Sequence, residues 1–268
     1  MTSAMLAGSV TAKLPGSATE FGARVLNRTH AGSPYLLRRA TSAEDIHAAQ
    51  ALRFLVFNLE LNEGLESSFA TLRDEDRFDP VCDHLLVEDR RTGEVVGTYR
   101  LQTGLSAGRN FGYYSEQEFD FSPYEPLRSR IIELGRACVH SEHRNLLVLG
   151  LLWKGIIAYA QEHGSRYLVG CSSLTSQDPR EGAAAFFELS DGHLVEPALR
   201  TFPQPAFYCD MQTLAAETPK IPKLLRAYLS FGSKICGPPA IDREFKTIDF
   251  LTWQDLEALP PGARRMLG

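Results

Sequence analysis

The sequence predicts an α+β fold, with a mixed, largely antiparallel sheet flanked by helices on both faces. Two observations support this prediction. Strand-like segments over 83–88 and 94–101 are separated by a short polar turn, as in an antiparallel hairpin. Farther along, a strand-like segment over 131–139, a helix-like segment over 146–162 and a strand-like segment over 166–171 follow one another, which is typical of a parallel strand–helix–strand unit.

The chain is expected to begin with a segment that does not fold. Residues 1–33 are rich in Ser, Thr, Ala and Gly without sustained periodicity, so we expect a disordered N-terminal arm. Residues 34–268 are expected to form a single domain, with a C-terminal extension that starts at about residue 215. The first strand of this domain is expected over 35–39.

The first helix is predicted from its capping box. Thr41 is the expected N-cap, and Glu44 is placed to reach back to the backbone of Thr41. The helix is expected to run to about residue 59, and Arg53 and Phe57 lie on its apolar stripe.

The other segments alternate between loops, helices and strands. The connection over 102–128 is rich in glycine and aromatic residues, and loops of this length inside a compact domain are usually functional. The C-terminal part is expected to contain a helix over 181–189, a strand over 207–211, a helix over 222–231, a strand over 245–251 and a short helix that opens at 252–255.

Composition excludes several classes of protein. The formal net charge of −5 argues against a general nucleic-acid binder, which needs a basic surface. Five cysteines without CxxC spacing favour a reduced, cytoplasmic protein over a disulfide framework. No signal peptide is evident, and the longest apolar run, over 146–153, is far shorter than the roughly 20 residues that span a bilayer. We therefore expect no integral membrane segment, and peripheral contact with the inner membrane stays open.

Two charged residues interrupt the apolar strand over 131–139. An unpaired charge in a buried strand costs several kcal/mol, so Glu133 and Arg136 are candidates for pairing or for chemistry. Side chains alternate along a strand, and a bulge at Gly135 would bring the two to one side. Glu133 could then accept a proton from an amine, while Arg136 could bind a carboxylate or pair with Glu133 or an aspartate. The alternative is a structural ion pair at a strand end.

Other charged positions allow two interpretations each. Arg53 either extends to solvent from its apolar stripe or is buried against the acidic segment over 73–79. Asp76 and Asp79 either belong to a solvated loop or orient arginines and hold an amine substrate. The His84–Asp89 spacing matches the HxxxxD motif of glycerolipid acyltransferases, but five residues along a strand put the side chains on opposite faces about 16 Å apart, so we interpret His84 as structural.

The cysteines and cofactor motifs give little support for covalent or metal chemistry. Cys138 and Cys171 could form acyl-thioesters, but the sequence places no histidine to activate them, and buried cysteine behaves as a small hydrophobe. No spacing typical of metal ligands, no P-loop and no GxGxxG motif occurs, so we expect no metal and no tightly bound cofactor.

Four motifs occur in the order seen in acyl-homoserine-lactone synthases, which have a GCN5-related N-acyltransferase fold. They are Arg53-x-x-Val56-Phe57, Asp76-x-x-Asp79, Gly97-Thr98-Tyr99-Arg100-Leu101 and Glu133-Leu134-Gly135-Arg136. Where that family has a tryptophan after the first motif, this chain has Leu61-Asn62-Glu63. Arg144-Asn145-Leu146-Leu147 replaces the glycine-rich turn that cradles coenzyme A pyrophosphate, which weakens the case for a coenzyme A donor.

The chain resembles the ornithine-lipid N-acyltransferases more closely, over about residues 35–255. The resembling segments are 78–87, 133–139, 151–156, 167–173 and 225–229. The resemblance implies transfer of a 3-hydroxyacyl chain from acyl carrier protein to the α-amine of an amino acid, either ornithine or glycine or another, as the first step of amino-acid-containing lipid synthesis. The donor would be the phosphopantetheine thioester of the carrier protein, with acyl-CoA as the alternative.

This resemblance also implies roles for particular residues. Glu133 would receive the amine proton, and a backbone N–H near the strand bulge at 136–138 would bind the thioester oxygen. Residues of the charged network and of the apolar acyl slot would bind substrate: Arg53, Phe57, Asp76, Asp79, Arg100, Arg136, Cys138, Val139 and Cys171. Basic residues would meet the acidic carrier protein, although a solvated helix face is the simpler interpretation of the last three: Arg144, Lys154, Lys220, Lys223 and Arg226.

Three rival functions stay open from the sequence. A signal synthase that makes an acyl-homoserine lactone or a free N-acyl amino acid would share the donor and differ in the acceptor. A coenzyme A-dependent acetyltransferase and a non-enzymatic membrane-associated protein are the other two alternatives.

Overall fold

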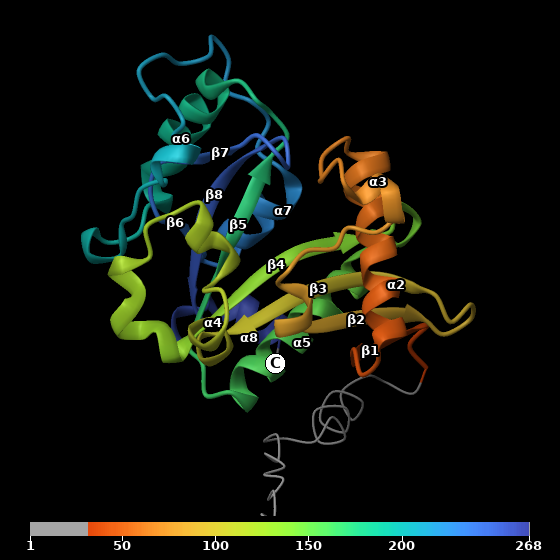
Figure 1. The fold of residues 1–268 in the computed structure, drawn as a ribbon. Coiled ribbons are helices and arrows are strands. Elements are labelled where there is room, and N and C mark those ends of the chain that lie inside the picture. Colours follow the sequence, from red (N-terminus) through yellow and green to blue (C-terminus); the bar gives the residue numbers. More distant parts are fainter. Residues whose placement is uncertain (1–31, 268) are drawn as a thin grey trace, which may run out of the picture.

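The computed structural model describes residues 32–267, which fold around one eight-stranded sheet (Figure 1). The strand order is β1-β2-β3-β4-β5-β8-β6, and β7 pairs with β8 beside β6. Only the β4–β5 pair is parallel, and all the other pairs are antiparallel. The predicted mixed, largely antiparallel sheet is therefore confirmed. The predicted disordered arm lies, up to residue 31, outside the described residues.

The strands and helices have the following bounds. The strands are β1 (Tyr35–Arg39), β2 (Asp83–Asp89), β3 (Val95–Thr103), β4 (Ile131–Val139), β5 (Tyr167–Leu174), β6 (Lys234–Ile235), β7 (Ala240–Asp242) and β8 (Thr247–Asp255). The helices are α2 (Ala43–Phe54), α3 (Ser68–Thr71), α4 (Gly104–Arg109), α5 (Leu146–Glu162), α6 (Pro179–His193), α7 (Lys223–Ser230) and α8 (Pro261–Leu267).

Helices cover both faces of the sheet, as predicted. On one face, buried residues of α5, including Leu152 and Ile156, form a core with Leu85 of β2 and Leu101 of β3. On the other face α2 crosses β3 and β4, and its apolar residues pack with Cys138 in a smaller core (Figure 1). Among the helices of residues 32–267, none has both the length and the apolar character needed to cross a bilayer.

The start of α2 differs by one residue from the predicted capping box. Ser42 is the N-cap, and its hydroxyl accepts a hydrogen bond from the Asp45 backbone N–H at 3.2 Å. The Asp45 carboxylate in turn accepts a hydrogen bond from the Thr41 N–H at 2.8 Å. Aspartate at this position thus does what Glu44 was expected to do. After Phe54 the helix continues as a π-helix over Leu55–Glu60.

Two predictions for the C-terminal part are wrong. The segment over 207–211 is not a strand: a 3-10 helix occupies Pro205–Phe207, and Tyr208 forms a single bridge to Ala240. Residues 252–255 do not open a helix, because β8 stays paired with β5 until Asp255, which then caps the short helix Leu256–Ala258.

The β4–β5 pair is short, and this shapes the centre of the molecule. Ile131–Glu133 pairs with Tyr167–Val169, and both strands continue beyond this point without pairing to each other. At Gly170, where pairing stops, an added Cβ would lie 2.2 Å from the Leu134 carbonyl oxygen, so only glycine fits there. The splayed strands inferred for the acyl slot are therefore present in the structure.

Candidate active site

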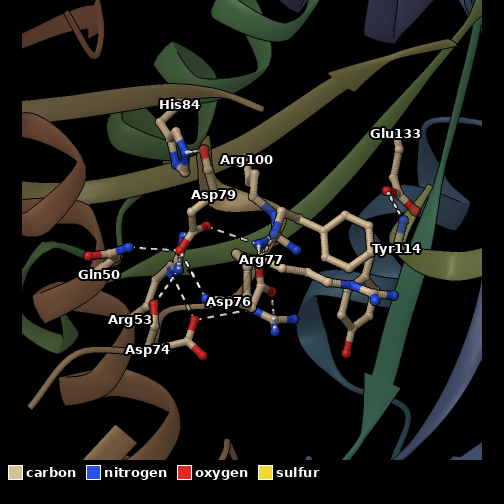
Figure 2. Close-up of polar contacts among 12 residues, drawn as sticks. Gln50, Arg53, Asp74, Asp76, Arg77, Asp79, His84, Arg100, Tyr114 and Glu133 are labelled. Carbon is tan, nitrogen blue, oxygen red and sulfur yellow. Dashed lines mark hydrogen bonds and ion pairs between the residues drawn. The ribbon is translucent and has the colours of Figure 1, made fainter. Parts of the chain in front are cut away.

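Three arginines and three aspartates form a closed ring of alternating charges beside the short β4–β5 pair (Figure 2). In order around what we call the Arg–Asp ring, the members are Arg53, Asp74, Arg136, Asp76, Arg100 and Asp79. The N–O distances between successive members are 2.7, 3.1, 3.1, 2.7, 3.0 and, back to Arg53, 2.7 Å. The ring joins α2, the segment over 74–79, β3 and β4, and its formal charges cancel.

The ring decides between the interpretations that the sequence left open. Arg53 has no exposed surface and donates hydrogen bonds to Asp74 and to both carboxylate oxygens of Asp79, so it is buried against the acidic segment. Asp76 and Asp79 orient arginines. Burial opposes ionisation of both carboxyls, but the arginine charges outweigh it and hold the pKa of Asp76 and of Asp79 below its ordinary value. A cleft of about 360 Å³, lined in part by His47, reaches Asp76 and Asp79 from the side of α2.

Arg136 lies on a bulge of β4, one residue after the predicted position. Thr98 pairs with Cys138 and Arg100 with Gly135, so two residues of β4 oppose the single Tyr99 of β3. Arg136 itself has a left-handed backbone, with φ of 51°. Such a bulge re-aims a side chain and releases backbone groups from the ladder. Arg136 and Glu133 consequently reach the same side of the sheet.

The Arg136 guanidinium is enclosed by aromatic rings as well as by aspartates. It lies 4.7 Å from the ring centre of Tyr114 and 4.6 Å from that of Phe245. Phe57, which was expected near the substrate, packs edge-on against Phe245 at 5.5 Å. Arg136 thus pairs with aspartates, which was one of the three alternatives, and forms no ion pair with Glu133.

Glu133 is buried and held by three hydrogen bonds from the loop that follows α4. The backbone N–H of Tyr114 donates to Oε2 at 2.7 Å (Figure 2), and the N–H and hydroxyl of Ser115 both donate to Oε1. Burial raises the pKa of Glu133 above its ordinary value, although these hydrogen bonds lower it. Because Oε2 receives only one of the three hydrogen bonds, it keeps a lone pair for a further donor. A fixed carboxylate with a raised pKa suits a proton acceptor.

Replacing Ser115 with alanine should shift the pH dependence of activity. The variant loses the hydroxyl that stabilises ionised Glu133, so the pKa of Glu133 should rise further. If activity needs the ionised form, the acidic limb of kcat/KM should move about one to two pH units higher, since a hydrogen bond to a charged group contributes roughly 1.5–3 kcal/mol. A pH–rate profile measures this. Ser122→Ala, which removes a hydroxyl from the exposed Asp120, is the control, and an unmoved limb in Ser115→Ala would contradict the role.

The cysteines do not line an apolar slot together. Cys138 is buried in the core beneath α2, and Val139 packs at the edge of the core beneath α5, so these neighbours face opposite sides of the sheet. The Cys171 thiol lies 3.7 Å from the Glu118 carboxylate, in polar surroundings. Burial raises the pKa of both thiols, which opposes a nucleophilic role. The expectation that Cys171 contacts an apolar chain is therefore wrong.

The basic residues chosen for carrier binding surround α5 and α7. Arg144 is exposed, and its guanidinium pairs with Glu60 at the entrance to α5. Lys154 is half-buried on α5, whereas Lys223 and Arg226 are exposed on α7 and Lys220 is exposed just before it. Tyr228 of α7 packs against Trp153 of α5, so the two helices lie side by side on the face opposite α2.

Sequence reasoning missed several residues of the site. Asp74 completes the Arg–Asp ring, and its place in the same acidic segment as Asp76 was the available signal. Tyr114 and Ser115 hold Glu133 through backbone groups, which carry no signature in the sequence. His84, in contrast, is buried with Nε2 at 3.1 Å from the Asp79 carbonyl oxygen, as expected of a structural residue.

Two groups of potential metal ligands come together in the described part of the chain, from positions whose spacing suggested none. Glu118, Cys171 and Asp249 each place one ligand atom within 4.8 Å of the others. The second group is His140, Glu142 and His143, in which His143 Nδ1 is hydrogen-bonded to the Tyr35 hydroxyl at 3.0 Å.

Comparisons with known proteins agree with this geometry. Residues 52–154 match the family model described as an acetyltransferase (GNAT) domain. In Brucella abortus, an L-ornithine N(alpha)-acyltransferase is 35% identical over 228 residues, which cover 80% of this chain and 81% of that protein. The protein of the same name in Rhodobacter capsulatus is 31% identical over 238 residues, which cover 84% of this chain and 91% of that protein.

Two solved structures share the fold at low sequence identity. TofI, in a ternary complex with an inhibitor and MTA, has a TM-score of 0.50 at 15% identity, covering 86% of this chain and 96% of that one. FeeM, an N-acyl amino acid synthase from uncultured soil microbes, has a TM-score of 0.50 at 11% identity, covering 86% of this chain and 99% of that one. The predicted GCN5-related fold is thus confirmed, and by its full-length relatives this N-acyltransferase belongs to the L-ornithine N(alpha)-acyltransferase family.

Proposed function

We propose that the protein transfers a 3-hydroxyacyl chain from acyl carrier protein to the α-amine of L-ornithine. The observation that carries the proposal is Glu133: a buried carboxylate fixed by Tyr114 and Ser115, with one oxygen open, at the point where β4 and β5 separate. The names of its relatives supply ornithine as the acceptor. A carrier protein donor would place the reaction in the cytoplasm, and contact with the inner membrane would suit a lipid product.

The proposed mechanism is direct transfer without an acyl-enzyme. The neutral α-amine attacks the thioester carbonyl carbon, so that a C–N bond forms and the C–S bond breaks. The proton lost by the amine goes to Oε2 of Glu133, which then passes it to the departing thiolate. Backbone N–H groups released at the Arg136 bulge stabilise the oxyanion.

The Arg–Asp ring positions these groups and carries no free charge of its own. It ties α2 and the segment over 74–79 to the bulge of β4, so Arg136 is fixed from two directions. Rigid support of this kind is what holds a reacting geometry to within fractions of an ångström.

The start of α5 favours a carrier protein over coenzyme A as donor. In related folds the N–H groups at a helix start bind pyrophosphate, because they lack partners in the helix. Here the Asn145 side chain accepts hydrogen bonds from the N–H groups of Leu147 and Val148, both at 3.0 Å. These N–H groups are therefore already occupied, and exposed Lys223 and Arg226 on the adjacent α7 offer charge to an acidic carrier protein.

Charge reversal on α7 should weaken the use of the carrier protein. In Lys223→Glu/Arg226→Glu we expect the KM for acyl carrier protein to rise about tenfold or more at low ionic strength and less at high salt, with kcat nearly unchanged. Steady-state kinetics at two salt concentrations measure this. Arg91→Glu, an exposed arginine in the β2–β3 turn, is the control, and an unchanged KM in the double variant would remove α7 from the docking surface.

Mass spectrometry of lipid extracts tests the proposed function. The chain would be expressed in a bacterial host that makes no ornithine lipid, and extracts would be compared with those from a host expressing Glu133→Gln. A new N-(3-hydroxyacyl)ornithine that is absent from the variant is the expected result. An acyl-homoserine lactone or an acylated glycine would instead identify a different acceptor, and the absence of any acylated amine, with folded protein present, would overturn the proposal.

A further inference from the structure

A second set of buried carboxyl groups lies near Glu133, and no cation balances it. Glu63, Glu118, Asp242 and Asp249 are each no more than 6% exposed. In the Arg–Asp ring every aspartate meets an arginine. By contrast, no lysine, arginine or histidine within residues 32–267 forms an ion pair with any of these four carboxyls. Buried charges without a partner are rare unless a ligand supplies one.

Glu118 and Asp249 are the centre of this set. Oε1 of Glu118 and Oδ1 of Asp249 are buried, and neither accepts a hydrogen bond from a backbone N–H or from a side-chain hydroxyl or amide. The other oxygens have weak donors, the Cys171 thiol at 3.7 Å from Glu118 and the Thr247 hydroxyl at 3.2 Å from Asp249. A buried acceptor left open in this way costs about 1–3 kcal/mol, and more when it is charged.

The electrostatics of the pair favour an added cation. Burial, and then the charges of Asp249 and Asp242, raise the pKa of Glu118 well above its ordinary value, and burial likewise raises the pKa of Asp249. Without a cation the two carboxyls must share a proton. An ammonium group offers up to three N–H donors and one positive charge, which matches the open oxygens.

The distance from Glu133 fits a diamino acid. Glu133 pairs with Val169, and Cys171, which contacts Glu118, is two residues farther along β5 on the same face. Two residues of a strand span about 7 Å. The α- and δ-nitrogens of ornithine are five bonds apart, and bonds of about 1.5 Å put them about 6 Å apart when extended.

We infer that Glu118 and Asp249 bind the δ-ammonium of the ornithine acceptor while its α-amine lies at Glu133; the inference rests on the proposed function. The pair thereby selects an acceptor with a cationic side chain of this length, and it keeps the δ-nitrogen away from the thioester. A metal ion fits the site less well, because burial keeps the Cys171 thiol protonated and a protonated thiol is a poor ligand.

A competition assay tests the inference. The enzyme, charged 3-hydroxyacyl carrier protein, and equal amounts of L-ornithine and L-norvaline are mixed, and the products are counted by mass spectrometry. Norvaline has the same carbon skeleton and no δ-amine. The wild type should favour ornithine by tenfold or more, and Glu118→Gln/Asp249→Asn should lose most of that preference while still acylating norvaline. Glu142→Gln/Asp120→Asn, which neutralises two exposed carboxyls, should keep it.

Calorimetric titration of ornithine without a donor separates this inference from the proposed function. If neither amino acid is acylated, the proposed function fails, and binding alone decides the site. Ornithine binding by the wild type that is lost in Glu118→Gln/Asp249→Asn, with an unchanged circular dichroism spectrum, supports the site. An unchanged product ratio, equal binding by both proteins, or no ornithine binding by the wild type overturns it.

Discussion

Replacing Arg53 with methionine is expected to lower the free energy of unfolding by about 3–5 kcal/mol, the usual result of removing one partner from a buried ion pair. Arg53 is fully buried and is the ring member that contacts both Asp74 and Asp79. Methionine fills much of the same volume, so the loss would come from two aspartates left without their counter-charge. Urea denaturation followed by circular dichroism measures it.

The control for this variant is an arginine in an exposed ion pair. Arg180 contacts Asp178 at 2.6 Å, but 60% of its side chain is exposed, so Arg180→Ala should change stability little. If Arg53→Met unfolds at the same urea concentration as the wild type, the Arg–Asp ring does not stabilise the fold. Its role in positioning the β4 bulge would then lose its basis.

Replacing Glu133 with glutamine is expected to reduce kcat by about 100- to 10,000-fold, the range typical of losing a general base. Glutamine keeps the size of the side chain and one acceptor oxygen for Ser115, so the fold should persist. Its NH₂ group cannot take the proton of the amine. Single-turnover kinetics with charged carrier protein measure the loss directly.

A glutamate at the end of the same strand provides the matched control. Glu142 is exposed in the short helix after β4, and Glu142→Gln should retain full activity. Thermal unfolding of both variants shows whether either has lost the fold. Activity near wild type in a folded Glu133→Gln would show that another group receives the proton.

Much of the fold was predictable because its elements have strong local signals. The strand over Tyr35–Arg39 and the helix Leu146–Glu162 have the predicted bounds, since alternation and an apolar run are local properties. The segment over 207–211 was misassigned because apolar residues alone do not make a strand where prolines at 203 and 205 remove backbone donors. The two short strands β6 and β7 are fixed by pairing with β8, which no local pattern encodes.

The candidate site was predictable only in part, for a related reason. Arg53, Asp76 and Asp79 could be singled out because charges break an apolar stripe or cluster in sequence. Their closure into a ring depends on the bulge at Arg136, which shifts a side chain to the other face and is set by strand register. Glu118 and Asp249 are far apart in sequence, so only the folded chain shows that they meet.

Tandem mass spectrometry of the reaction product tests the account most directly. The purified protein would be given 3-hydroxyacyl carrier protein and L-ornithine, and fragmentation would show which nitrogen carries the acyl chain. The account predicts a single product acylated on the α-nitrogen, formed by the wild type and not by Glu133→Gln. Acylation of the δ-nitrogen, or equal product from Glu133→Gln, would contradict it.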